Sequence, residues 1–277
     1  MAQIEYFNMH TQKLTPKVSI VMPSFNQADF IERSIQSVLN QDYPNIELIV
    51  IDGGSTDGSV EIIKQYASKI AYWVSEPDEG QAQAINKGIT KATGEWIGWQ
   101  NSDDLFAPNA ITEMVACALK NPKADLVIGD MAMIDTQDQK IRNIRYIRPT
   151  YRSILAEGMV LTNQSAIWRR KIHQEIAYLN EDLHFGFDYE WFLRILKRYT
   201  AAHVPMVLGY LRMHPQTKSS LQQPQFIKEY ELIWQGGRPN KLIRTFYKAR
   251  RYSIHLLKGQ FSHLIEQTKF ALNNFLR

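Results

Sequence analysis

The first half of the chain alternates short runs of aliphatic residues with stretches in which apolar residues recur at helical spacing. The runs 18–22, 48–51 and 95–99 predict strands, and the helical patterns cover 30–40, 59–67, 81–90 and 109–121. Such alternation is typical of an α/β protein whose mainly parallel central sheet is flanked by helices. Beyond Val127-Ile128-Gly129 the segments 134–139 and 140–146 have the pattern of a hairpin, which predicts an antiparallel extension of the sheet.

The composition is that of an ordinary globular protein. The 277 residues are 44% hydrophobic and 22% charged, which suits one domain with an appendage or two small domains. The single cysteine, Cys117, excludes an intrachain disulfide and suggests a reducing compartment. No apolar run approaches the roughly 20 residues of a membrane span, and residues 1–16 lack the apolar core of a signal peptide. We therefore expect a cytoplasmic protein.

Charge is spread unevenly along the chain. Of the net charge of +4, residues 225–277 carry +7, from ten Lys or Arg against three Glu, which leaves −3 for residues 1–224. The segment 214–225, rich in Pro, Gln and Ser, is the best candidate for a boundary. We expect an N-terminal extension over 1–16, a main domain over 17–224 and a basic helical tail over 225–277.

Three predicted strands end in polar or acidic residues. These ends are Pro23-Ser24-Phe25-Asn26, Asp52-Gly53-Gly54-Ser55-Thr56-Asp57-Gly58 and Asn101-Ser102-Asp103-Asp104. Ligands of open α/β sheets bind beyond such strand ends, and adjacent carboxylates suit a divalent cation held against a diphosphate. The pattern predicts an enzyme acting on an activated phosphate ester. A nicotinamide-dependent oxidoreductase is disfavoured, because the glycines do not form Gly-x-Gly-x-x-Gly.

The order of several segments resembles that of the family 2 glycosyltransferases of GT-A fold. The segments are Pro-Ser-Phe-Asn at 23–26, Ile-Asp-Gly-Gly-Ser-Thr-Asp-Gly-Ser at 51–59, Asn-Lys-Gly-x5-Gly-Glu at 86–95, Asn-Ser-Asp-Asp at 101–104, Trp-Arg-Arg at 168–170, Phe-Asp-Tyr-Glu-Trp-Phe-Leu-Arg at 187–194 and Tyr-Leu-Arg-Met-His at 210–214. The resemblance covers about residues 17–214. It implies transfer of a sugar from a nucleotide diphosphate sugar to a hydroxyl acceptor, with inversion at the anomeric carbon and with Mn²⁺ or Mg²⁺. It also implies a nucleotide-binding half over 17–130 and an acceptor half over 131–224.

The resemblance gives the acidic pair and one histidine roles at the diphosphate. It implies that Asp104 binds the metal and that Asp103 binds ribose and sugar hydroxyls. His214 matches a position that reaches back to the metal or the diphosphate, where imidazole is a suitable ligand. The alternatives are that the acidic pair caps the helix after Pro108 and that His214 is an ordinary surface or core residue.

The remaining donor-site candidates are expected to contact the nucleotide. The resemblance implies that Asp52 reads the base and that Pro23, Ser24, Phe25 and Asn26 line the nucleotide's other side. Further candidates are Asp78, Gly80, Gln81 and Asn86. Asp52 has the alternative of a turn residue, Phe25 that of a core aromatic, and Asp78 that of a helix cap. Ile85 stands where many members have Arg, so UDP is a preference only.

One-step inversion needs a base facing the acceptor hydroxyl. The resemblance assigns this role to Asp188, with Glu190 as the runner-up. The alternative for Asp188 is the N-cap of a helix over 189–198, and Glu190 has the alternative of a solvated first-turn acid. A cap role and a base role are compatible, because helix amides keep a carboxylate ionised.

The tail contains a basic amphipathic helical pattern over 238–258, with seven Lys or Arg and no acid. Lys241, Arg244, Lys248 and Arg251 share one side, and Leu242, Ile243, Phe246, Ile254 and Leu257 share the other. Such a helix either lies on an anionic membrane surface or packs its apolar side on the main domain or on a second subunit. Nucleic acid is not expected as a partner, because no binding module is recognised.

The predicted function is an inverting, metal-dependent glycosyltransferase of bacterial surface polysaccharide, lipopolysaccharide or capsule synthesis. Its acceptor would be a saccharide or a lipid-linked saccharide. Two alternatives remain open: a non-catalytic nucleotide-sugar-binding protein of the same fold, and a sugar nucleotidyltransferase. The second normally carries an early Gly-rich loop with Lys or Arg, which this sequence lacks.

Overall fold

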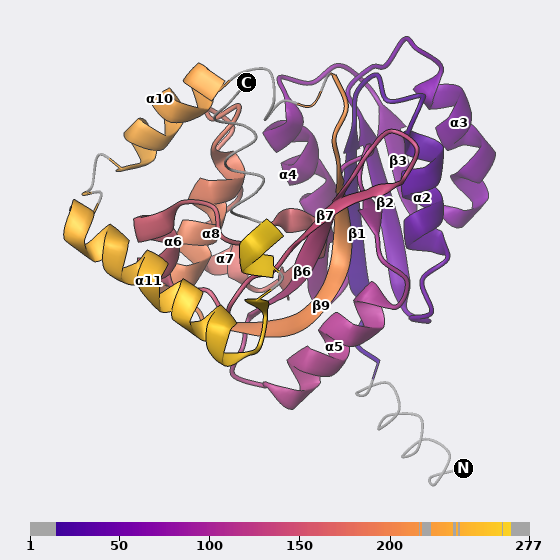
Figure 1. Cartoon of the computed structure of the whole chain (residues 1–277). Helices are drawn as coiled ribbons and strands as arrows, with labels where there is room; N and C mark the ends of the chain where they lie inside the picture. The colour runs from indigo at the N-terminus through magenta and orange to yellow at the C-terminus, as the bar shows by residue number, and fades with distance from the viewer. Residues whose placement is uncertain are drawn as a thin grey trace, which may run out of the picture.

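The computed structural model describes residues 15–215, 217, 223–234, 237, 239–261 and 263–266. Within them a nine-stranded mixed sheet has the order β3-β2-β1-β4-β8-β6-β9-β5, with β7 paired to β6 (Figure 1). The strands are β1 Val18–Ser24, β2 Ile46–Asp52, β3 Tyr72–Ser75, β4 Trp96–Trp99, β5 Leu105–Phe106, β6 Leu126–Ile134, β7 Lys140–Ile144, β8 Ala166–Arg169 and β9 Ala201–Arg212. Strands β1 to β4 are mutually parallel, so the predicted parallel sheet is confirmed.

The antiparallel extension is also confirmed. β7 pairs with β6 as a hairpin, and β8 runs antiparallel to both β4 and β6. β9 is long and curved, and it pairs in parallel with β6 and antiparallel with β5. The sheet is therefore parallel from β1 to β4 and mixed from β5 onwards.

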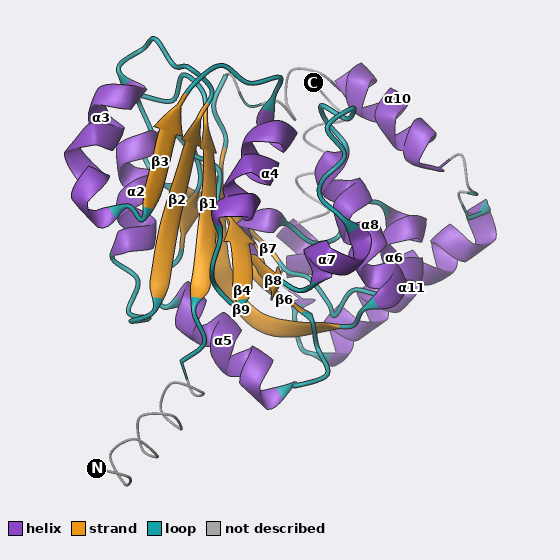
Figure 2. Ribbon diagram, turned by 180° about the vertical axis from the view of Figure 1, so that it is seen from behind, coloured by secondary structure: helices purple, strands orange, loops and turns teal. Residues whose placement is uncertain are grey.

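Helices cover both faces of the sheet (Figure 2). One apolar cluster contains α2 (Ile31–Leu39), α3 (Ser59–Tyr66) and α5 (Ala110–Lys120), and the other contains α4 (Gln81–Lys91), α6 (Tyr151–Glu157), α7 (Ile172–Ile176) and α8 (Phe187–Arg198). Strand β1 serves both clusters, with Val18, Ile20 and Met22 in the first and Val21 in the second. Side chains of a strand alternate between its faces, so an unbroken aliphatic run fits a strand covered on both sides.

Two further helices follow the sheet, on the side of α6 and α8 (Figures 1 and 2). α10 spans Gln223–Ile233 and α11 spans Lys241–Leu257. Helix formation over most of 238–258 was expected, but the apolar side of the helix does not pack on the main domain. Leu242, Phe246 and Leu257 are exposed, whereas Arg251 turns inward and pairs with Glu157 of α6 at 2.7 Å. The expected extension over 1–16 lies almost entirely outside the described residues.

Candidate functional site

The parallel strands end at a common edge of the sheet, where the predicted donor residues meet. Ser24 is in register with Asp52, and Asp52 with Ser75. The next strand, β4, leads into Gln100, whose backbone N–H donates to the Val21 carbonyl. The loops that follow β1, β2, β3 and β4 therefore converge, as expected for carboxyl ends of parallel strands.

The loops after β1 and β2 are joined by hydrogen bonds. The Asn26 N–H donates to the Ser55 hydroxyl at 2.8 Å, and the Thr56 N–H donates to Asn26 Oδ1 at 3.0 Å. Pro23 and Ser24 are buried at the end of β1, but Phe25 is 59% exposed. The core alternative for Phe25 is therefore wrong. Its ring stands at the carboxyl edge, free to contact a flat ligand.

Asp52 fixes the shape of the loop that follows it. The carboxylate is fully buried and accepts hydrogen bonds from the Gly54 and Ser55 amides at 3.1 and 2.9 Å. It also accepts from the hydroxyls of Ser55 and Ser75 at 2.5 and 2.7 Å. This is the geometry of the turn alternative. The base-reading role of Asp52 stays a prediction.

Asp78 lies between two of the loops. Its Oδ1 accepts from the Gly80 N–H at 2.9 Å, and a Cβ added to Gly53 would lie 2.7 Å from its Oδ2. Glycine at position 53 therefore lets the carboxylate approach the loop after β2. Gly80 has φ +136°, a left-handed conformation that favours glycine, and it immediately precedes α4.

Asp104 is the centre of a buried hydrogen-bond network. It is 1% exposed, and its Oδ1 accepts from the Arg212 N–H at 2.8 Å. Its Oδ2 accepts from Asn101 Nδ2 at 2.9 Å and from Gln164 Nε2 at 2.6 Å. Burial, with the neighbouring charge of Asp103, raises the pKa of Asp104 well above its usual range. The metal-ligand role of Asp104 stays a prediction that this geometry does not favour.

Asn101 extends this network towards α4. Its Oδ1 accepts from Gln81 Nε2 at 2.8 Å and from Trp99 Nε1 at 2.6 Å. Gln81, expected at the donor, is thus tied to the acidic segment through one amide. Sequence reasoning named Asn101 only as part of its motif and missed Gln164, because nothing local marks a partner 60 residues from Asp104.

Asp103 has a different partner from those of Asp104, namely His214. Its Oδ2 lies 3.0 Å from His214 Nε2, and its side chain is 21% exposed. The His214 ring packs on Phe30, with centroids 4.8 Å apart. Arg212 supports the same segment by donating from Nε to the Asp103 carbonyl at 2.7 Å and by pairing with Asp138. The structure thus joins a carboxylate oxygen and an imidazole nitrogen from segments 111 residues apart.

This pair fits a divalent cation that also binds phosphates. The described residues contain no group of three or more His, Cys, Asp or Glu placed to hold a metal. Mg²⁺ and similar ions are commonly held by one or two protein groups, with substrate phosphates and waters completing the shell. Asp103 and His214 supply two suitable donors, so the residues present match such a shared site.

Asp188 and Glu190 both lie in the first turn of α8. The helix begins at Phe187 after Gly186, so Asp188 is not the N-cap and that alternative is wrong. Asp188 Oδ1 lies 2.6 Å from the N–H of Tyr189. Glu190 forms a two-point ion pair with Arg194, at 2.6 and 2.8 Å. The pairing engages both oxygens of Glu190 and disfavours it as a base.

Asn86 is buried and fastens a distant loop to α4. Its Oδ1 accepts from the Leu179 N–H at 2.9 Å, and its Nδ2 donates to the Leu179 carbonyl at 2.9 Å and to Glu181 at 2.7 Å. These bonds occupy the amide, so its donor-binding role stays a prediction that the geometry does not favour. The contact instead holds the segment that begins at Leu179 against the middle of α4.

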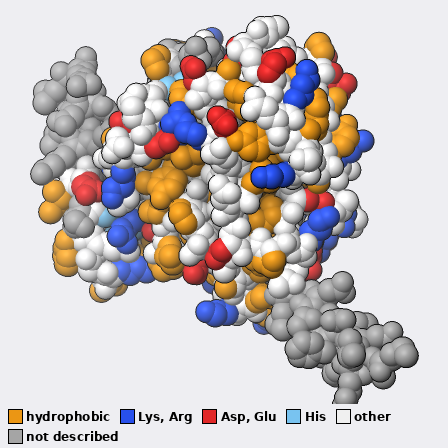
Figure 3. All heavy atoms as spheres, turned by 90° about the vertical axis from the view of Figure 1, so that its right-hand side faces the viewer, with side chains coloured by type: hydrophobic (Ala, Val, Ile, Leu, Met, Phe, Trp, Pro, Cys, Tyr) orange, Lys and Arg blue, Asp and Glu red, His pale blue; other side chains and the backbone are white. Residues whose placement is uncertain are grey.

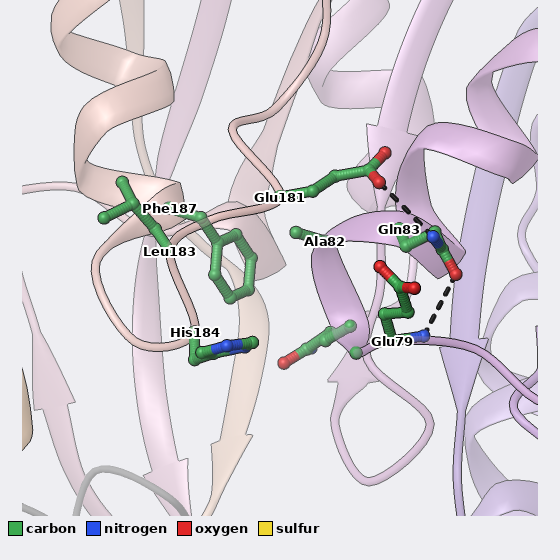
Figure 4. Close-up of a pocket in the computed structure, with 9 residues that line it drawn as sticks. Glu79, Ala82, Gln83, Glu181, Leu183, His184 and Phe187 are labelled. Carbon is green, nitrogen blue, oxygen red and sulfur yellow. Dashed lines mark hydrogen bonds between the residues drawn. The ribbon is translucent and has the colours of Figure 1, made fainter.

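A pocket lies where this segment faces α4, and the space over it, open solvent included, is about 220 Å³ (Figure 4). His184 and Phe187 line one side, and Ala82 and Gln83 line the other. The Phe187 ring stacks on Trp99 with centroids 5.5 Å apart, which links the start of α8 to the end of β4. Sequence reasoning missed His184 and Glu181, because the segment before α8 has no periodic pattern.

Comparisons with known proteins identify the family of the chain. The family model "Glycosyl transferase family 2" matches residues 19–194. An uncharacterized glycosyltransferase of Rickettsia typhi is 29% identical over 244 residues, which cover 82% of this chain and 73% of that protein.

Two solved structures show the same fold. The structure of S. aureus TarS in complex with UDP-GlcNAc superposes with a TM-score of 0.65 at 16% identity, covering 86% of this chain and 72% of that one. A mannosyltransferase from Pyrobaculum calidifontis, in complex with GDP-Man and Mn²⁺, gives a TM-score of 0.60 at 18% identity, covering 94% and 81%. Because the family model spans well over half of the sequence, the chain belongs to glycosyl transferase family 2 and is a glycosyltransferase of GT-A fold.

Proposed function

We propose that the protein transfers a sugar from a nucleotide diphosphate sugar to a hydroxyl acceptor, with inversion. One observation carries this proposal: the pocket joins the amino end of α4, tied to the acidic segment through Gln81 and Asn101, to the first turn of α8 that holds Asp188. A donor at the strand ends would thus have its sugar between the diphosphate site and a carboxylate.

The nucleotide would lie against the loops after β1 and β2. The exposed ring of Phe25 offers a stacking surface for a base or ribose, and Asp78 faces the same loops. Relatives of this fold have been solved with UDP-GlcNAc and with GDP-Man. UDP is our preferred donor nucleotide, on the resemblance of the loop motifs.

We assign the diphosphate end to Asp103 and His214. A bound Mn²⁺ or Mg²⁺ would offset the negative charge that grows on the leaving diphosphate, and these two side chains would hold it. Asp104 would not bind the metal itself but would hold Asp103 in place. Its hydrogen bonds from Arg212, Asn101 and Gln164 would fix the backbone that carries Asp103.

At the other end, Asp188 would remove the acceptor proton. The acceptor oxygen forms its bond to the anomeric carbon as the bond from that carbon to the diphosphate oxygen breaks. The proton passes to the carboxylate, and the bonding electrons leave with the diphosphate. Asp188 sits in the first turn of α8, where the helix amides favour the ionised form that a base requires.

The direct test is nucleotide release from a panel of UDP- and GDP-sugars, with Mn²⁺ and with EDTA, for the wild type and for Asp188→Asn. We expect metal-dependent turnover in the wild type and a loss of at least a hundredfold in the variant, with nucleotide affinity kept. Full activity of Asp188→Asn would reject Asp188 as the base. Nucleotide-sugar binding without turnover by the wild type would favour a non-catalytic binding protein.

We further propose that the enzyme works on the cytoplasmic face of a bacterial membrane, on a saccharide or lipid-linked saccharide for surface polysaccharide. Leu242 and Leu257 of α11 are 81% and 87% exposed, and seven Lys or Arg lie within 238–258. This combination supports contact with anionic lipid. On the face that carries α2 and α3, by contrast, charges of both signs are interspersed (Figure 3). No described helix is long and apolar enough to cross a membrane.

A further inference from the structure

A carboxylate from the C-terminal part of the chain closes the amino end of α8. Glu229 of α10 accepts three backbone hydrogen bonds: from His184 at 2.9 Å, Phe185 at 2.8 Å and Gly186 at 2.6 Å. These amides immediately precede α8, at the positive end of its dipole. A carboxylate is therefore a strong acceptor at this place. Glu229 lies beyond the segment matched by the family model.

Aromatic contacts fix α10 over the same segment. Phe226 packs on Phe185 with ring centroids 5.1 Å apart, and Tyr230 packs on Tyr189 at 4.7 Å. Trp234 Nε1 donates to the Tyr189 hydroxyl at 2.8 Å. The position of Glu229 is thus set by neighbours on both sides of it along α10.

The approach of α10 also depends on a glycine. A Cβ added to Gly186 would lie 2.9 Å from Ile233 Cδ1 and 3.3 Å from Tyr230 Cδ1. Burial, followed by the charge of Asp188, raises the pKa of the Tyr230 phenol. Asp188 therefore lies close enough to act on α10 electrostatically, and Glu229 of the same helix holds the backbone of the pocket residue His184.

We propose that Glu229 is a positioning residue, which holds the His184 wall of the pocket and the first turn of α8 in the geometry that transfer needs. The inference rests on the proposed function, since Asp188 is the base only there. Glu229 touches no reacting atom in this scheme. It acts through three amides, of which the first belongs to a pocket residue and the last lies two residues before Asp188. A shift of about 1 Å in such a group lowers a rate by about a hundredfold.

Two substitutions and a matched control test this role. Glu229→Ala removes the acceptor, and Glu229→Gln keeps one acceptor oxygen but places an amide NH₂ against backbone donors. Glu231→Ala removes a carboxylate from an exposed position of the same helix. We expect kcat to fall about ten- to hundredfold in Glu229→Ala, less in Glu229→Gln, and not at all in Glu231→Ala. The dissociation constant for UDP with Mn²⁺ should stay within twofold of wild type in all three variants.

A purely structural role predicts a different result. Activity would then follow the folded fraction in thermal melts, and UDP affinity and kcat would fall together. That outcome overturns the proposal, as does wild-type kcat in Glu229→Ala.

Hydrogen exchange separates this inference from the proposed function. Amides 184–186 should exchange faster in Glu229→Ala than in the Glu231→Ala control, whether or not the protein turns over a sugar nucleotide. If the wild type transfers no sugar, the proposed function fails, and faster exchange still supports Glu229 as the group that holds this wall. Unchanged exchange at these amides overturns the inference even in an active enzyme.

Discussion

At the scale of single residues, two adjacent carboxylates have opposite environments. Asp104 is buried and accepts three hydrogen bonds, whereas Asp103 is partly exposed and lies beside His214. We expect Asp103→Asn to abolish the Mn²⁺-dependent part of UDP binding while the fold is kept. Asp104→Asn should instead lower the free energy of unfolding by about 1–3 kcal/mol, because the amide NH₂ replaces one accepting oxygen and faces donors that it cannot accept from. Thermal melts with and without UDP and Mn²⁺ measure both effects, and a full manganese-dependent shift in Asp103→Asn would contradict the assignment.

His173 makes stability depend on pH. The ring is buried, its Nε2 accepts from Trp168 Nε1 at 2.9 Å, and its Nδ1 lies 3.1 Å from the Ala177 carbonyl. Burial lowers the pKa of His173 to about 4 from 6.5. Between these values the unfolded chain binds a proton that the folded protein does not, so stability is complete above pH 6.5 and falls as the pH drops towards 4.

We expect protonation of His173 to lower the free energy of unfolding by up to about 3 kcal/mol between pH 6.5 and pH 4. Urea unfolding at pH 7.5 and pH 5 should show a smaller difference in His173→Gln than in the wild type. Burial also lowers the pKa of His263 to about 4 and the pKa of His255, so a residual acid effect should remain in the variant. Equal pH dependence in the two proteins would show that His173 is not a source of it.

At the scale of elements, sequence periodicity predicted where helices and strands form better than it predicted which strands pair with each other. The helices expected over 30–40, 59–67, 81–90 and 109–121 are found within one or two residues of those bounds. Periodicity carries no information on the insertion of β8 between β4 and β6, which depends on pairs such as Gly98 with Ile167. A two-residue strand such as β5 is too short to show a period.

Helix α11 shows the same limit and yields a prediction. The sequence predicted an amphipathic helix, but not which of its two sides faces solvent. The basic residue Arg251 faces the protein, because it pairs with Glu157, and periodicity does not reveal such a pair. We expect the wild type to bind vesicles that contain phosphatidylglycerol, and to bind less at high salt. The double variant Leu242→Ser/Phe246→Ser should bind at least tenfold more weakly, since each side chain contributes about 1.5–3 kcal/mol when buried.

The matched control is Met206→Ser, which alters an exposed apolar side chain on β9. It should bind vesicles like the wild type. Binding of the double variant at wild-type strength, or no binding by the wild type to anionic vesicles in low salt, would contradict a membrane role for α11.

At the scale of the whole molecule, the candidate site is assembled from segments that the sheet order brings together. The order of the sequence motifs resembles that of a known family, so candidate site residues could be named from the sequence. They lie at 23–26, 52, 78–81, 101–104, 188 and 214. Their division into exposed and buried groups could not be predicted, since it depends on partners such as Gln164 and Arg212 that lie 60 and 108 residues from Asp104. Glu229 had no motif to mark it, because its role exists only once α10 packs on α8.

Ligand binding at the candidate site should stabilise the folded protein against thermal unfolding. A ligand that binds only the folded state at a hundred times its dissociation constant adds about 2.7 kcal/mol, which for a domain of this size corresponds to a rise in Tm of about 5–10 °C. We expect that rise with UDP and Mn²⁺, a smaller one with GDP and Mn²⁺, and little with UDP and EDTA, because the proposed metal site at Asp103 and His214 would leave most of the metal shell to the diphosphate. Equal shifts for UDP and GDP would contradict the donor preference, and a shift that survives EDTA would contradict the metal site.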